Sequence, residues 1–73
     1  MLLNKMRIKE TRRIKNILES DSGRARRLYE MGFVPGTMVQ MTHKTLFLSP
    51  FSVKIRGYEV ILGSHDAKLI EVE

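Results

Sequence analysis

Apolar and polar side chains alternate in three segments of the second half of the chain, at residues 37–42, 51–56 and 58–62. A period of two is typical of strands that bury one face. Gly57 separates the last two segments, where a tight hairpin needs a residue that tolerates positive φ. Residues 63–66 are predicted as a turn, either irregular or a single 3₁₀ turn, after which Ile70 and Val72 repeat the spacing. The pattern therefore predicts four strands, the middle two joined as a hairpin.

The segment before residue 20 fits two patterns. Ile14, Ile17 and Leu18 have the spacing of a helix face. Thr11 and the two isoleucines are β-branched, however, and turn-forming residues follow at 20–23, which favours a strand. A strand would bury both isoleucines only if a bulge between them shifts the alternation. Residues 1–6 are left as a loose N-terminus.

Residues 25–33 have the pattern of a short helix and its end. Ala25, Leu28 and Met31 follow one another at intervals of three and form an apolar stripe. Gly32 can take the left-handed conformation that ends a helix. In that arrangement Phe33 contacts Leu28, as in a Schellman cap. We therefore expect the helix to end at Gly32.

A turn follows the helix directly. Pro35 cannot continue a helix, and its fixed φ followed by the permissive Gly36 suits the central pair of a type II turn. Thr37 then begins the strand at residues 37–42. With the first segment taken as a strand, the chain has five short strands and one helix, which favours a compact barrel.

Length and composition indicate one globular domain over residues 1–73. The chain is 42% hydrophobic and 29% charged, and it lacks cysteine, which excludes disulfides and thiolate chemistry. No apolar run approaches the roughly 18 residues of a membrane span. A soluble, unprocessed chain is the expectation.

Positive charge is concentrated in the first third of the sequence. Residues 1–27 hold nine Lys/Arg and three Asp/Glu, a net +6, whereas residues 28–73 hold four and five, a net −1. Such a bias suits a nucleic-acid or anionic-membrane partner. It equally suits charges that solvate exposed faces, and no interleaved aromatic set accompanies it. Arg24, Arg26 and Arg27 are expected on the helix outside its apolar stripe, available to a phosphate or to an acidic protein surface.

Three consecutive large apolar residues, Leu46, Phe47 and Leu48, occupy the connection between two predicted strands. Loops usually hold polar turn residues, so something should cover this trio. It either plugs the barrel end or forms a docking patch for another protein, a second copy or a membrane surface.

The sequence gives little support to catalysis or metal binding. His43 and His65 belong to different predicted elements, and His65 with Asp66 supplies at most two donors. We therefore expect no catalytic, metal or cofactor site, and no enzyme.

The run RRLYEMGFVPGT at residues 26–37 resembles the RxLxxxGfxPGt signature of the FeoA-like family of small SH3-like barrels. Residues 49–62 and 67–72 are similar to later parts of the same family, so the resemblance covers roughly residues 6–73. The chain departs from the family pattern at Leu48 and Ser49, where Gly-Asp is common, and at Gly63, where an arginine is common.

The resemblance implies a mainly β, five-stranded SH3-like barrel with one short helix between the first and second strands. It also implies a cytoplasmic accessory protein that binds the membrane ferrous iron transporter FeoB, a GTPase-linked permease, and reaches the membrane only through it. The candidate partner-binding residues are Leu46, Phe47, Leu48, Arg24, Arg26 and Arg27. Alternatives are a nucleic-acid-binding barrel, a stand-alone regulatory domain of an iron-dependent repressor system, and a homo-oligomer.

Overall fold

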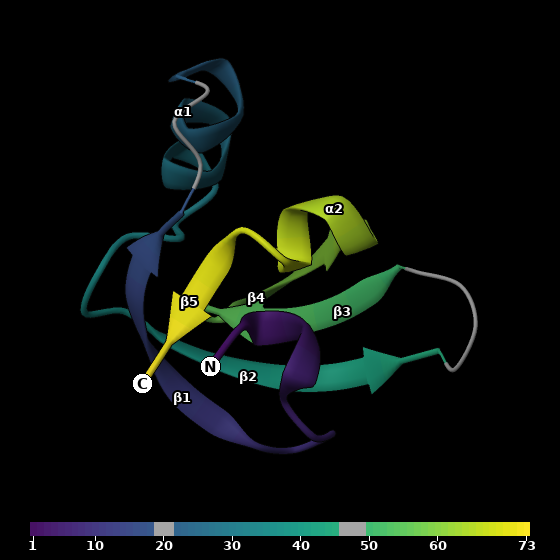
Figure 1. Cartoon of the computed structure of the whole chain (residues 1–73). Helices are drawn as coiled ribbons and strands as arrows, with labels where there is room; N and C mark the ends of the chain where they lie inside the picture. Colours follow the sequence, from purple (N-terminus) through teal and green to yellow (C-terminus); the bar gives the residue numbers. More distant parts are fainter. Residues whose placement is uncertain (19–21, 46–49) are drawn as a thin grey trace.

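Five strands form one antiparallel sheet in the order β4-β3-β2-β1-β5 (Figure 1). The computed structural model describes residues 1–18, 22–45 and 50–73. Its strands are β1 (Thr11–Ile17), β2 (Met38–Lys44), β3 (Phe51–Ile55), β4 (Tyr58–Leu62) and β5 (Ile70–Val72). The 3₁₀ turn η1 (Leu3–Lys5) precedes β1, the helix α1 (Ser22–Glu30) joins β1 to β2, and the short helix α2 (Ser64–Ala67) joins β4 to β5. The predicted mainly β fold with one helix between the first two strands is confirmed.

The predicted bulge in β1 is also confirmed. Ile14 pairs with Val72, but the next pair joins Asn16 to Glu71, so the register shifts between them. Both Ile14 and Ile17 are buried as a result. A bulge adds one residue to one strand, which brings side chains three apart to the same face.

The end of α1 has the predicted Schellman geometry. The Phe33 amide donates to the Leu28 carbonyl at 3.0 Å, and the Gly32 amide donates to the Tyr29 carbonyl at 3.0 Å. Gly32 has a φ of 105°, and Phe33 and Leu28 are both buried. The helix end therefore directs Phe33 into the core.

The two predicted turns are present as well. The Thr37 amide donates to the Val34 carbonyl at 3.1 Å, and Gly36 has a φ of 95°, as the third residue of a type II turn requires. Arg56 and Gly57 both have positive φ and form the two-residue turn between β3 and β4. Each turn fixes the start of the strand that follows it.

The N-terminus differs from the prediction, because residues 1–6 are not loose. Leu3 and Met6 are fully buried, and Leu2 forms a bridge with Glu71 of β5. The Val72 amide donates to the Met1 carbonyl at 2.7 Å. Two apolar side chains over so short a segment give no clear period, and their burial depends on β5, which lies at the far end of the sequence.

The turn predicted at residues 63–66 is present as the short helix α2, with α-helical rather than 3₁₀ spacing. The Ala67 amide donates to the Gly63 carbonyl at 3.1 Å, which is the spacing of an α-helix. Ala67 is buried and belongs to the core. The buried apolar side chains of the described residues are Leu3, Met6, Ile14, Ile17, Leu28, Phe33, Val39, Met41, Phe51, Val53, Ile55, Leu62, Ala67, Ile70 and Val72.

A membrane-crossing helix needs 18 or more residues of sufficient hydrophobicity, and the described ranges contain no helix that meets this requirement.

Candidate functional site

Of the three candidate arginines on α1, two already have acidic partners. Arg24 Nη1 lies 2.9 Å from Asp66 Oδ1 and links α1 to α2. Arg26 Nε lies 3.6 Å from Glu30 Oε2, one turn along the same helix, and both side chains are largely exposed. Such an exposed pair contributes only about 0.3–0.5 kcal/mol. Arg27 forms no ion pair with any described residue, so of these three arginines it is the one most available to an external partner.

The apolar trio Leu46, Phe47 and Leu48 lies outside the described residues. The strand pairing between β2 and β3 ends, on the side of the trio, with Lys44 opposite Phe51. The structure therefore does not test whether the trio and the arginines of α1 form one surface, and the role of the trio stays a prediction.

A polar cluster on the outer face of β2, β3 and β4 was not found from the sequence. Thr42 Oγ1 and Ser52 Oγ donate to Glu59 Oε2 at 2.9 and 2.8 Å, and His43 Nδ1 lies 3.8 Å from the same oxygen. We call these four residues the Glu59 cluster. The register of β2 shifts between Met41 and His43, which lets the neighbours Thr42 and His43 face the same side.

The Glu59 cluster borders a groove of about 530 Å³. The groove is lined by Gln40, Thr42, His43, Lys54, Gly57, Tyr58 and Glu59. The hydrogen bond from Ser52 has the largest effect on the pKa of Glu59 and holds it below its ordinary value. The hydrogen bond from Thr42 and, to a smaller extent, the charges of His43 and Lys54 lower it further. The cluster therefore presents an ionised carboxylate near neutral pH.

As a metal site the Glu59 cluster is incomplete. It offers one imidazole and one carboxylate, whereas a protein metal site usually needs three or four donors. His65 lies on α2 and His43 on β2, so the two belong to different elements, as the sequence predicted. Across residues 1–18, 22–45 and 50–73, no group of three or more His, Cys, Asp or Glu side chains could hold a metal ion.

We expect the Glu59 carboxyl to titrate below 4.5, its ordinary value. Because the folded-state pKa is lowered, the ionised group stabilises the fold above pH 4.5, and this stabilisation is lost as pH falls through the folded pKa. Replacing Ser52 with alanine should raise the pKa toward 4.5. An NMR titration of the side-chain carboxyl carbon measures both values. Ser64→Ala, at an exposed position of α2, is the control and should leave the Glu59 pKa unchanged. A wild-type pKa at or above 4.5 would contradict the cluster.

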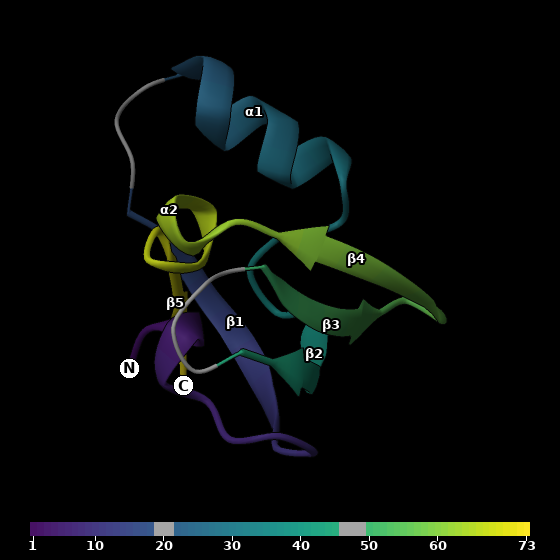
Figure 2. The same cartoon turned by 90° about the vertical axis from the view of Figure 1, so that its right-hand side faces the viewer.

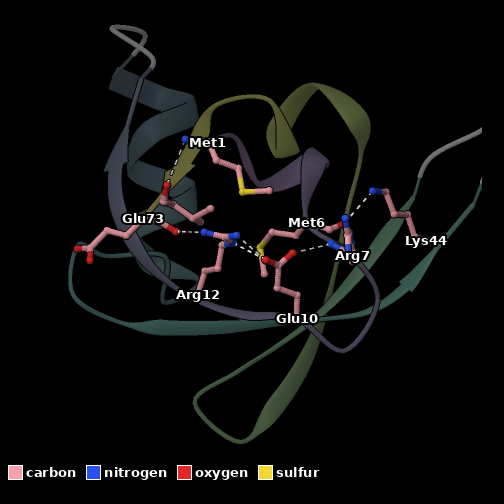
Figure 3. Close-up of polar contacts among 8 residues, drawn as sticks. Met1, Met6, Arg7, Glu10, Arg12, Lys44 and Glu73 are labelled. Atoms are coloured by element: carbon pink, nitrogen blue, oxygen red, sulfur yellow. Dashed lines mark hydrogen bonds and ion pairs between the residues drawn. The ribbon is translucent and has the colours of Figure 1, made fainter.

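A second polar network holds the N-terminal segment against the sheet (Figure 3). The Arg7 amide donates to Glu10 Oε1 at 2.8 Å, and Arg12 Nε donates to Glu10 Oε2 at 2.6 Å. Lys44 Nζ donates to the Met6 carbonyl at 2.7 Å. Both hydrogen bonds lower the pKa of Glu10, and the one from the Arg7 amide has the larger effect. This network joins residues before β1 to β2, so we interpret it as structural.

The FeoA domain family matches the chain over residues 1–73. No curated protein sequence matches it. Among solved structures, the chain is similar to iron(II) transport protein A from Clostridium thermocellum, with a TM-score of 0.90 and 32% identity over 100% of this chain and 44% of that one. The chain thus spans less than half the length of that relative.

Two further structures extend the comparison. A FeoA from Stenotrophomonas maltophilia, described as a prokaryotic SH3 domain protein and complexed with zinc, matches with a TM-score of 0.88 and 28% identity over 100% of this chain and 89% of that one. A manganese-dependent transcriptional repressor in complex with manganese matches with a TM-score of 0.92 and 26% identity, over 100% of this chain and 35% of that one. The predicted SH3-like fold is therefore confirmed.

Proposed function

The chain belongs to the FeoA domain family, which is linked to ferrous iron transport, and on this premise we propose that it is a cytoplasmic, non-enzymatic accessory protein that binds the membrane transporter FeoB and modulates it. The observation that carries the proposal is the family match over the whole chain. The likeness to iron(II) transport protein A over all of this chain supports it.

The surface of the molecule is compatible with binding another protein. Arg27 is exposed without an ion pair to a described residue, and the chain carries a net charge of +5. Such charges speed the encounter with an acidic partner more than they raise final affinity. Burial of Leu46, Phe47 and Leu48 against the partner would supply the affinity, because a few apolar anchors usually dominate an interface. We therefore assign anchoring to the trio and steering to Arg27.

The test measures binding of the full chain to the cytosolic part of a FeoB transporter. Replacing Leu46, Phe47 and Leu48 together with serine should weaken binding by about tenfold or more, the loss of at least one anchor of about 1.4 kcal/mol. Arg27→Ala should mainly slow association and reduce its dependence on salt. Ile8→Ser, at a residue 51% exposed, is the control and should bind normally. A triple variant that remains folded and binds with wild-type affinity would contradict the assignment.

The likeness to the manganese-dependent repressor favours a second candidate, the regulatory SH3-like domain of a metal-dependent repressor system. In that role the chain would bind a DNA-binding repressor chain rather than a transporter. The same binding measurement, made with a manganese-dependent repressor in place of FeoB, separates the two roles.

A further inference from the structure

Strand β4 has one row of backbone groups that no described residue pairs with. It is an outer strand of the sheet and pairs with β3 in a regular register from Phe51↔Leu62 to Ile55↔Tyr58. Across a two-residue turn the flanking residues exchange both hydrogen bonds, and alternate pairs along the ladder do the same. The amides and carbonyls of Glu59 and Ile61 therefore point away from β3. No described residue forms a backbone hydrogen bond with them from that side.

The opposite edge of the sheet is covered by the chain itself. Leu2 bridges to Glu71 of β5, and Met1 and Val72 exchange backbone hydrogen bonds. Proteins commonly protect exposed edges with proline, lysine or a bulge. Strand β4, the outermost strand in Figure 2, contains neither proline nor lysine, and no bulge interrupts its pairing with β3. Within residues 1–18, 22–45 and 50–73, one edge is closed and the other is available for strand addition.

The side chains along β4 add apolar contacts to this edge. Ile61 is 69% exposed, the highest fraction among the large apolar side chains of the described residues, and Tyr58 is 47% exposed. Ile61 lies three positions after Tyr58, and side chains alternate along a strand, so the two lie on opposite faces. The Tyr58 hydroxyl donates to the Met31 carbonyl at 2.7 Å, which holds its ring in place. A strand added to β4 would therefore meet an apolar side chain on each face.

The charges near β4 indicate what the added strand is. The β3–β4 hairpin carries two cations, Lys54 and Arg56, and one carboxylate, Glu59, which lies opposite Lys54 and feels its charge. A second copy would bring another net charge of +5 against this surface, which opposes association. An acidic segment would instead meet the net positive charge of the hairpin beside the backbone edge.

We propose that the free edge of β4 is a docking site for an extended, acidic segment of a partner protein, which adds to the sheet as a further strand. Main-chain hydrogen bonds to Glu59 and Ile61 would supply affinity, and Tyr58 and Ile61 would select the side chains of the segment. The proposal rests on the proposed function only in that the chain works by binding a protein, and it does not require that protein to be FeoB.

The test uses the isotope-labelled full chain and a short synthetic peptide in which valine alternates with glutamate. NMR should show the largest shifts at the Glu59 and Ile61 amides, with slower hydrogen exchange. Ile61→Pro removes the outward amide and leaves the β3–β4 ladder intact, because proline is tolerated where the N–H of an edge strand faces solvent. It should weaken binding by about tenfold or more. Ile61→Ala, the matched control, keeps the amide and should bind more tightly than the proline variant.

Several results would overturn the proposal. The first is a set of shifts confined to residues other than Glu59 and Ile61. The second is binding by Ile61→Pro as tight as that by Ile61→Ala. The third is binding of a valine–lysine peptide as tight as that of the valine–glutamate peptide. A wild-type dimer that Ile61→Pro dissociates would assign the edge to a second copy instead. If Ile61→Pro does not fold, Glu59→Pro removes the other outward amide and takes its place. If the chain binds the peptide as predicted but does not bind FeoB, only the proposed transporter partner is refuted.

Discussion

Replacing Phe33 with alanine should leave the protein largely unfolded in dilute buffer. Phe33 is fully buried, and it is the largest of the fully buried side chains. Truncating a buried phenylalanine costs about 3–5 kcal/mol, because the transfer free energy is lost and a cavity remains. A single core of this size supplies a stability of roughly 3–5 kcal/mol. The expected loss therefore equals the whole stability of the domain.

Urea unfolding followed by circular dichroism measures this effect. Tyr29→Ala is the matched control, because Tyr29 is also aromatic, lies four residues earlier and is 40% exposed. Its loss should stay below about 1 kcal/mol. If Phe33→Ala unfolds at the same urea concentration as Tyr29→Ala, the helix end does not direct Phe33 into the core.

Replacing Leu3 with alanine should cost about 2–5 kcal/mol, the range for a buried leucine. Leu3 is fully buried in the segment that the sequence left as loose. It sits in η1, which contacts both α2 and β5, so its loss should destabilise the end of the sheet where the two chain termini meet.

The midpoint of urea unfolding is again the measurement, with Ile8→Ala as control. Ile8 is an aliphatic residue five positions away and is 51% exposed, so its loss should be below about 0.5 kcal/mol. Equal midpoints for the two variants would mean that residues 1–6 contribute nothing to the core.

Local patterns explain why much of the fold could be predicted. The alternation in β2, β3 and β4, the glycine at the end of α1 and the turn at Pro35 and Gly36 each depend on neighbouring residues. Even the bulge in β1 followed from the spacing of Ile14 and Ile17. Each of these features is present in the structure.

The remaining features depend on residues far apart in the sequence. Arg24 and Asp66 are 42 positions apart, and nothing near Arg24 indicates that it is already paired. The Glu59 cluster joins three strands and needs a register shift in β2 that no local signal shows. The Arg56 and Gly57 turn does fix Lys54 opposite Glu59, so this neighbour of the cluster could have been inferred from the hairpin alone.

The same reason applies to the free edge of β4. Strand order is a property of the whole sheet, so the sequence could not show that β4 is an outer strand or that the N-terminal segment covers β5. The sequence instead indicates candidate partner-binding residues in an apolar loop and a basic helix, because those features are visible locally. Of these, Arg27 remains the arginine without an ion pair to a described residue.

The most direct test of the account is an NMR titration of the isotope-labelled full chain with the unlabelled cytosolic part of FeoB. We predict saturable shifts at Glu59 and Ile61 on β4, and at Thr45 and Pro50, which flank the apolar trio. Resonances of Ile8 and other residues near the N-terminus should not move. A spectrum that stays unchanged when FeoB is present in large excess over the labelled chain would contradict the proposed accessory role.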